Sequence, residues 1–281
     1  MRDFAPPPRF HGRVPPTSPS PADGPIVRDK RAMLFFVLGA FLLGNALLAE
    51  MIGVKLFQLE EVLGAPKADF RLFGKDGLSF VLSAGVISWP LVFLVTDLVN
   101  DYFGVRGVRA ITLVTAGMIA LAFPLLYVAI ALPAERGWWL TSSAQAGVPD
   151  MQAAFTAVFG QGMNIIVGSL AAFLVSQLVD AFVFRRFKRF TGEKRIWLRA
   201  TGSTLVSQLV DSLLVVYIAF GLFRGMPAPE ALALALTSYC YKFLVAVLST
   251  PLVYLGHFLI ERWLGQDLAA AMRRQALQAG D

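Results

Sequence analysis

Residues 33–49 read MLFFVLGAFLLGNALLA, an apolar run that contains no charged side chain. Extended to about residues 32–57, the run is long enough to cross a hydrocarbon core roughly 30 Å thick as a helix. Further apolar runs follow at about 79–103, 108–132, 155–184, 200–223 and 232–261. The sequence therefore predicts an all-α integral membrane protein with six transmembrane helices.

The composition excludes an ordinary soluble enzyme. Of the 281 residues, 56% are hydrophobic and 16% are charged, whereas a soluble domain has roughly 25% charged residues. The one cysteine, Cys240, and the two histidines, His11 and His257, provide neither a disulfide framework nor the usual ligand sets for zinc. No glycine-rich phosphate-binding motif occurs. We therefore expect no cofactor, no metal and no enzymatic activity.

The polar segments set the predicted domain boundaries. Prolines crowd into the first 25 residues, so we expect residues 1–30 to form a disordered cytoplasmic tail. Residues 31–264 form the predicted six-helix transmembrane domain, and residues 265–281 form a cytoplasmic C-terminal tail.

The basic residues predict the orientation. Most of the 25 Lys and Arg residues precede the first span, follow the sixth, or lie between spans two and three or four and five. Such a bias places both termini in the cytoplasm. We therefore interpret the run 185–189, RRFKR, as a topology anchor rather than as a binding site for a polyanion or lipid headgroup. The net charge of +6 then requires no nucleic-acid partner.

A short motif recurs along the chain. Residues 174–180 and 205–211 both read LVSQLVD, and residues 94–101 read LVTDLVND. One interpretation is an inverted repeat of three plus three helices. The other is chance similarity between helices rich in Leu and Val.

Ionisable side chains inside the spans are costly and therefore suggest function. Asp101 and Asp180 lie near the predicted cytoplasmic ends of their spans, so we expect them to reach the interface or to pair with nearby arginines. Lys55 lies near the predicted outer end of span one, and we expect its side chain to reach the interface there. Asp211 and Lys242 lie near the midplane on adjacent antiparallel spans, and we predict that they interact. That pair either locks two helices together or belongs to a substrate or proton site. The predicted spans hold these ionisable residues: Glu50, Lys55, Asp97, Asp101, Asp180, Asp211 and Lys242.

Polar residues form stripes at helical spacing on three spans, which favours a shared polar cavity. The stripes are Thr204, Gln208 and Asp211; Ser238, Lys242 and Ser249; and Gln161, Asn164 and Gly168. On span two, Pro90 predicts a kink that frees the carbonyl of Val86. A mid-span Trp89 near Asp97 then favours a pocket for a planar ligand.

Several stretches together resemble the queuosine precursor transporter family, six-helix membrane proteins similar to vitamin uptake transporters. They cover about residues 33–264 and lie in the family's order and spacing. These stretches are Asn45, Glu50 and Lys55; WPLVFLVTD at 89–97, continued by DYFG at 101–104 and Arg109; SQLVDS at 207–212 with IAF at 218–220; and YCYK at 239–242 with Pro251.

The resemblance implies uptake of 7-deazaguanine precursors of queuosine across the inner membrane of a bacterium, for tRNA modification. The substrate is then a cyano- or aminomethyl-deazaguanine or a queuine-like base, a small planar deazapurine. Its ring N–H and amino donors suit a carboxylate, for which Asp97 is the first choice, with Trp89 and Phe93 as apolar walls. The candidate substrate-binding residues are Trp89, Phe93, Asp97, Glu50, Asn45, Gln208, Asp211, Tyr239, Lys242 and Asn164.

One alternative from a different class stays open, namely a substrate-binding membrane subunit of an ATP-driven importer for vitamins or nucleobases. A docking face of small residues on span one, such as Ala40 and Gly44, would favour it. The same pair could form a homodimer contact in a stand-alone transporter. The expected partners are therefore the small substrate, membrane lipid and a second copy of the chain.

Overall fold

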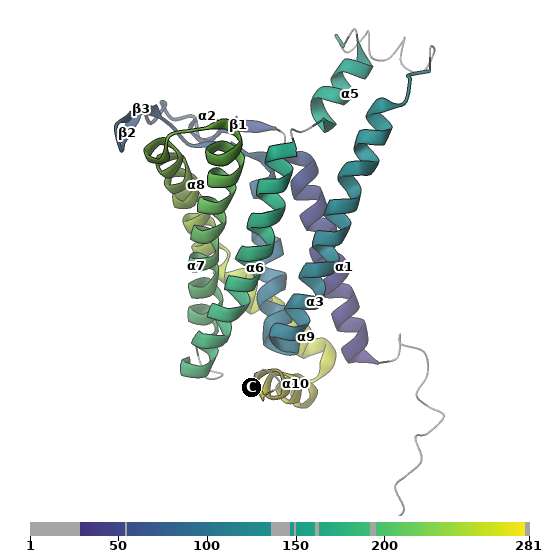
Figure 1. Cartoon of the computed structure of the whole chain (residues 1–281). Coiled ribbons are helices and arrows are strands. Elements are labelled where there is room, and N and C mark those ends of the chain that lie inside the picture. The colour runs from purple at the N-terminus through teal and green to yellow at the C-terminus, as the bar shows by residue number, and fades with distance from the viewer. Residues whose placement is uncertain are drawn as a thin grey trace, which may run out of the picture.

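The structure is a computed structural model that describes residues 29–53, 55–135, 147–148, 150–160, 163–191 and 195–278. Within these residues, five helical stretches are long and apolar enough to cross a membrane. The helices that form them are α1 (Lys30–Ile52), α3 (Trp89–Ala131), α6 (Met163–Thr191), α7 (Ile196–Val216) with its π-helical continuation η3 (Tyr217–Leu222), and α8 (Ala228–Leu248). The all-α membrane class is confirmed at this level (Figure 1).

Helix α3 is folded back on itself. Its 43 residues would span about 64 Å if straight, which is twice a hydrocarbon core. Gly104 interrupts it with φ 69° and ψ −174°, a conformation open almost only to glycine. Phe103 stacks on Phe35 near the start of α1, and Ile111 beyond the break packs against Gly39. The two segments, 89–103 and 105–131, therefore lie where the second and third spans are predicted (Figure 1).

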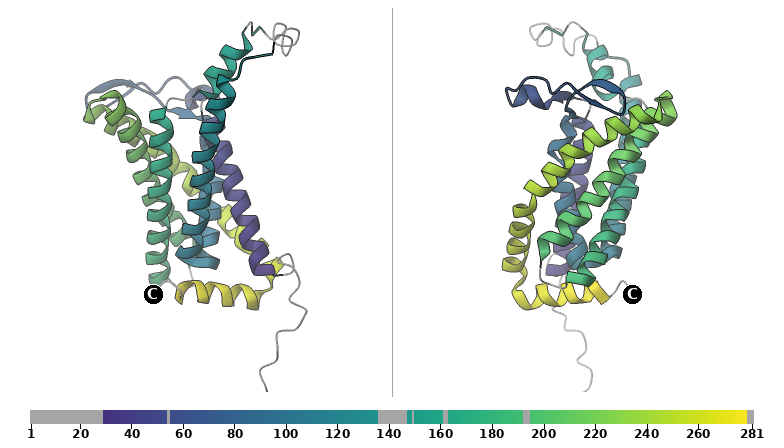
Figure 2. Two further views of the ribbon diagram at one scale, coloured as in Figure 1. Left: turned by 45° about the vertical axis from the view of Figure 1, so that its right-hand side comes forward. Right: turned by 90° about the vertical axis from the view of Figure 1, so that its left-hand side faces the viewer.

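The last predicted span, 232–261, is two helices in the structure. Helix α8 ends at Leu248, and α9 (Thr250–Leu264) has Pro251 in its first turn. Proline is tolerated there because the first N–H groups of a helix have no acceptor within it. Helix α10 (Gln266–Gln278) then lies across the end of the bundle (Figure 2), with Met272 buried. Part of the predicted C-terminal tail is thus an ordered helix against the membrane domain.

A small region with β-strands covers the opposite end of the bundle. Strand β1 (Leu56–Gln58) pairs with β4 (Val81–Ser83), and β2 (Phe70–Leu72) pairs with β3 (Lys75–Leu78), both antiparallel. The short helices α2 (Leu59–Val62) and η2 (Ala84–Ile87) complete it. The expectation that span one continues to residue 57 and span two starts at 79 is therefore wrong, because these residues form strands. Lys55 lies beyond the end of α1 and is exposed.

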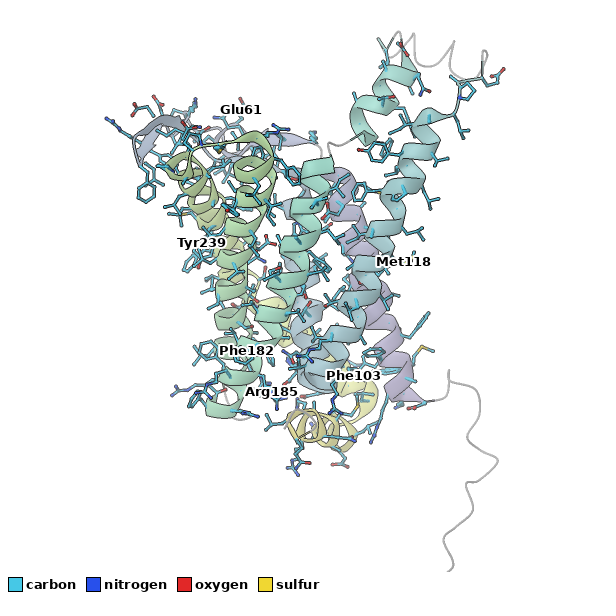
Figure 3. The ribbon with its side chains drawn as sticks, in the orientation of Figure 1. Glu61, Phe103, Met118, Phe182, Arg185 and Tyr239 are labelled. Carbon is cyan, nitrogen blue, oxygen red and sulfur yellow. The ribbon has the colours of Figure 1, made fainter. Side chains whose placement is uncertain are left out.

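The two ends of the bundle differ in charge. We call the end that holds Arg106, Arg109, Arg185 and Arg199 the basic end, and the end that holds the strands the strand end. Figure 3 places Glu61 at the strand end and Arg185 and Phe103 at the basic end. Lys30 at the start of α1 donates to the carbonyl of Trp263 near the end of α9 at 2.9 Å. The first and last helices of the bundle thus reach the same, basic end.

Candidate functional site

A cavity of about 550 Å³, including the part that is open to the surroundings, lies between the first segment of α3, the first half of α7 and the junction of α8 with α9. We call it the Trp89 cavity. Thr201 on α7 and Thr250 at the start of α9 share a hydrogen bond of 2.9 Å and hold two of the three elements together.

The α3 wall of the cavity includes Trp89, Phe93 and Asp97, together with Pro90 and Leu94. The first three are four residues apart and therefore face the same side of the helix. The ring of Trp89 lies 6.1 Å from that of Phe93 and 5.9 Å from that of Phe173 on α6, centroid to centroid. The carboxyl of Asp97 ends the row and is 3% exposed.

Trp89 owes its position to the start of α3, not to a kink. Pro90 occupies the first turn of α3, where backbone N–H groups have no acceptor within the helix. Pro90 therefore does not kink the helix. Val86 belongs to the preceding 3₁₀ turn η2. The predicted proline kink and the mid-span position of Trp89 are therefore wrong, because β4 and η2 occupy residues that were assigned to the span.

The opposite walls carry polar side chains from α7 and α8. Thr204 and Gln208, members of one predicted stripe, line the cavity together with Lys242 and Ser249 from another. Two members of each stripe thus line one cavity, whose other lining residues are mostly apolar, and Asp211 and Ser238 are not among them. The third stripe is not tested, since Gln161 and the side chain of Asn164 lie outside the described residues.

Lys242 links the cavity to Asp211. Its Nζ atom lies 2.6 Å from Oδ2 of Asp211, with the two side chains 22% and 15% exposed. The predicted interaction of these residues is confirmed. Ser176 on α6 donates a weaker hydrogen bond of 3.4 Å to Oδ1 of Asp211.

Glu50, near the end of α1, contacts the side of α6 that also faces Asp211. Ser169 donates a hydrogen bond to Glu50, and Ser176 lies two helical turns further along α6. Glu50 does not line the cavity.

Two other candidates lie away from the cavity. The side-chain amide of Asn45 donates to the carbonyl of Phe41, one turn back on its own helix, at 2.8 Å. Tyr239 packs edge-on against Phe243 and projects from the outer side of α8 (Figure 3). The aromatic residue of α8 that lines the cavity is Tyr241, which sequence reasoning missed.

A buried ionic cluster joins four helices at the basic end. Asp101 on α3 contacts Lys188 of α6 at 2.6 Å and Arg199 of α7 at 2.8 Å, and His257 of α9 lies 3.6 Å away. Asp101 therefore pairs with basic residues, as expected. Lys188 and Arg199 are 3% and 0% exposed, so Lys188 is buried in the bundle although it belongs to the run that is interpreted as a topology anchor. Helix α6 continues to Thr191, which takes Lys188 into the bundle.

Asp180 behaves differently from the expectation. It is 0% exposed and accepts a hydrogen bond of 3.0 Å from Ser207 on α7. Because α6 extends about three turns beyond it, Asp180 lies well inside the bundle. Its neighbours on α6 bind α3: Gln177 accepts a hydrogen bond of 2.7 Å from Thr96, and the carbonyl of Ala181 accepts one of 3.1 Å from Asn100.

The chain is similar to known transporters. Residues 83–256, which include every cavity-lining residue, match the family described as "Putative vitamin uptake transporter". The chain is 31% identical over 173 residues to the "Probable queuosine precursor transporter" of Bacillus subtilis, covering 60% of this chain and 69% of that protein. It is 30% identical over 175 residues to the "Queuosine precursor transporter" of Escherichia coli, covering 60% and 70% respectively. No solved structure shows significant similarity.

Proposed function

We propose that this chain, which belongs to the vitamin uptake transporter family, imports 7-deazaguanine precursors of queuosine. It is a multi-pass protein of the bacterial inner membrane and a transporter rather than an enzyme.

The observation that carries the substrate assignment is the row Trp89, Phe93 and Asp97 along one wall of the cavity. A deazaguanine is planar and presents ring N–H and amino donors side by side, which one carboxylate can accept in a bidentate manner. Oδ1 of Asp97 is buried and has no donor among the described residues. We therefore assign the donor edge of the substrate to Asp97 and its faces to the two aromatic rings.

The carbonyl group of the base is assigned to the opposite wall. Gln208 and Lys242 line that wall and can donate hydrogen bonds to a carbonyl oxygen. Lys242 is held by Asp211, so its ammonium group is oriented before the substrate arrives. Glu50 does not line the cavity, and we assign it no contact with the base.

We further propose six crossings with both termini cytoplasmic. The two segments of α3 count as separate crossings, α8 with α9 forms the sixth, and the basic end faces the cytoplasm by the positive-inside rule. Single cysteines at Asp76 and at Arg274, in a Cys240→Ser background, are expected to react with an impermeant thiol reagent from opposite sides. Labelling of both from one side would contradict this topology.

The substrate assignment is tested by uptake of radiolabelled cyano-deazaguanine into proteoliposomes. Asp97→Asn turns one acceptor into a donor facing the donors of the base, so uptake should fall about 100-fold or more while the protein still folds. Asp76→Asn is the matched control, because Asp76 is exposed at the strand end and pairs only with Arg71 among the described residues. Unchanged uptake by Asp97→Asn would refute the assignment.

The same assay separates the alternative function. A stand-alone transporter takes up substrate in liposomes that contain only this chain. A substrate-binding subunit of an ATP-driven importer would bind the base there without transporting it, and would co-purify with an ATPase. Gly44 on α1 has open space at its Cα, so the small-residue face is available to either a second copy or another subunit.

A further inference from the structure

Two charged residues line the Trp89 cavity, Asp97 on α3 and Lys242 on α8, and the other lining residues among those described are neutral. The proposed function assigns Asp97 to the donor edge of the base. Within the described part of the cavity, Lys242 is then the charged group that faces the rest of the ligand. Its charge therefore bears on which substituents of the base the cavity accepts.

The Lys242–Asp211 pair presents its positive member to the cavity. The Nζ atom of Lys242 lies 2.6 Å from Oδ2 of Asp211, and Asp211 is not among the lining residues. The carboxylate thus lies behind the ammonium group as seen from the ligand. An ammonium group has three N–H donors. Asp211 takes one of them, which leaves donors for acceptors on the ligand.

The chemistry of the base places its 7-substituent beside its carbonyl group. In a 7-deazaguanine, the carbonyl carbon and the carbon that carries the 7-substituent are bonded to the same ring carbon. The carbonyl oxygen and the 7-substituent therefore project side by side from one edge of the base. Gln208 and Lys242 are assigned to the carbonyl, so the 7-substituent lies next to the same ammonium group.

The cyano and aminomethyl precursors offer different groups to Lys242. A nitrile is neutral, and its nitrogen accepts a hydrogen bond. An aminomethyl group is a primary amine which, like the lysine side chain, is protonated at neutral pH and can only donate. Two ammonium groups side by side repel each other, most strongly where the surroundings are apolar. The acid that lines the described part of the cavity, Asp97, is already engaged by the donor edge.

We propose that Lys242 is a specificity-determining residue that makes the cavity select the cyano over the aminomethyl base. The inference rests on the proposed function, because the orientation of the base follows from the assignments of Asp97, Gln208 and Lys242. In that orientation the nitrile accepts a hydrogen bond from Lys242. The aminomethyl ammonium must either approach Lys242 or withdraw the base from Asp97, and both weaken its binding.

Three bases that differ only in the 7-substituent test the inference on the wild-type protein. Unlabelled cyano-, aminomethyl- and hydroxymethyl-deazaguanine compete with radiolabelled cyano-deazaguanine for the purified protein. The aminomethyl base should compete at least about tenfold more weakly than the cyano base, because of its charge. The hydroxymethyl base is close to the aminomethyl base in size but neutral, and should compete nearly as well as the cyano base.

Two outcomes of this competition would overturn the proposal. One is an aminomethyl base that competes as well as the cyano base or better. The other is equally weak competition by the aminomethyl and hydroxymethyl bases, because size rather than charge would then decide.

Substitutions of Lys242 provide the second test. Lys242→Gln removes the positive charge and leaves the carboxylate of Asp211 without its partner, so the relative affinity should shift toward the aminomethyl base by about tenfold or more. Lys242→Arg keeps the charge and should keep the preference for the cyano base. An unchanged preference in folded Lys242→Gln would contradict the role of this residue.

Lys75→Gln is the matched control for Lys242→Gln. Lys75 is also paired with an acid, Glu230, at 2.8 Å, but it lies at the strand end and does not line the cavity. Its substitution removes the same charge from the protein and should leave the preference for the cyano base unchanged. An equal shift in Lys75→Gln would show that the preference does not arise at Lys242.

The two proposals can fail separately. If the wild-type protein binds none of the three bases, the proposed function fails. If it binds the cyano and aminomethyl bases equally well, only the selectivity fails. Should Lys242→Gln not fold, the comparison of the aminomethyl and hydroxymethyl bases on the wild-type protein still decides, because it separates charge from size without any substitution.

Discussion

The pair Lys242–Asp211 gives a quantitative test of the site. The perturbations are Asp211→Asn, Lys242→Gln and both together, all close in size to the native side chains. At a separation of 2.6 Å and an effective dielectric constant of about 20, the attraction is about 6 kcal/mol, most of which desolvation offsets.

Each single substitution leaves one charge without its partner. Removing one member of a buried pair costs about 3–5 kcal/mol. The side chains of Lys242 and Asp211 are 22% and 15% exposed. We therefore expect a cost at the lower end of this range, about 3 kcal/mol for each single substitution. Removing both leaves no bare charge and should cost about 2 kcal/mol. The coupling energy in the double-mutant cycle is then about 4 kcal/mol, within the range measured for close charge pairs.

The assay is unfolding by SDS in mixed micelles, followed by circular dichroism. Ser176→Ala is the matched control, since its hydrogen bond to Asp211 is long at 3.4 Å and should change the free energy of unfolding by less than about 1 kcal/mol. A coupling energy below about 0.5 kcal/mol would refute the reasoning. If the double variant folds normally but transports nothing, the pair serves the substrate site rather than stability alone.

Three further expectations concern other parts of the molecule. Trp89→Ala should weaken binding of the base by about 1–3 kcal/mol through loss of stacking, and Trp89→Phe should recover part of this in an equilibrium binding assay. Gly104→Ala should lower the free energy of unfolding by about 2 kcal/mol, because φ is 69° there; Gly117→Ala, with open space around it, should not. The N–H of Phe80 donates to Glu60 and lowers the pKa of Glu60. The stabilisation of the strand region by Glu60 is therefore present above the ordinary glutamate pKa of about 4.3 and lost as pH falls through the lowered value. The protection of amides in residues 56–83 from hydrogen exchange, corrected for the intrinsic rate at each pH, should fall at that acidic pH in the wild-type protein, and Glu60→Gln should abolish this pH dependence.

The apolar runs were sufficient to predict the class of fold and most of the helices. Spacing alone also brought Thr204, Gln208 and Lys242 to one cavity, because helical periodicity decides which residues share a face. The strand region escaped prediction, since β4 (residues 81–83) is apolar and reads as the start of a span. Pro90 was misplaced for the same reason.

The burial of charged residues within the helix bundle was also difficult to predict. Lys188 and Arg199 were counted as loop residues, because hydropathy penalises a charge without knowing its partner. Both pair with Asp101, and the helices continue past them. Tyr239 lies three residues before Lys242, and Tyr241 lies four residues before Val245. Both spacings place the two residues on one side of a helix, so spacing alone does not tell which tyrosine lines the cavity. The relative rotation of packed helices decides such cases, and it depends on tertiary contacts.

The central claim is that this chain imports queuosine precursors. It is tested most directly in a bacterium that lacks both its own precursor synthesis and its own transporter, supplied with a cyano- or aminomethyl-deazaguanine at low concentration. Expression of the wild-type chain should restore queuosine in tRNA, measured by mass spectrometry of digested nucleosides, and Asp97→Asn expressed at an equal level should not. Absence of queuosine from the tRNA of cells that hold the wild-type protein in their inner membrane would contradict the account.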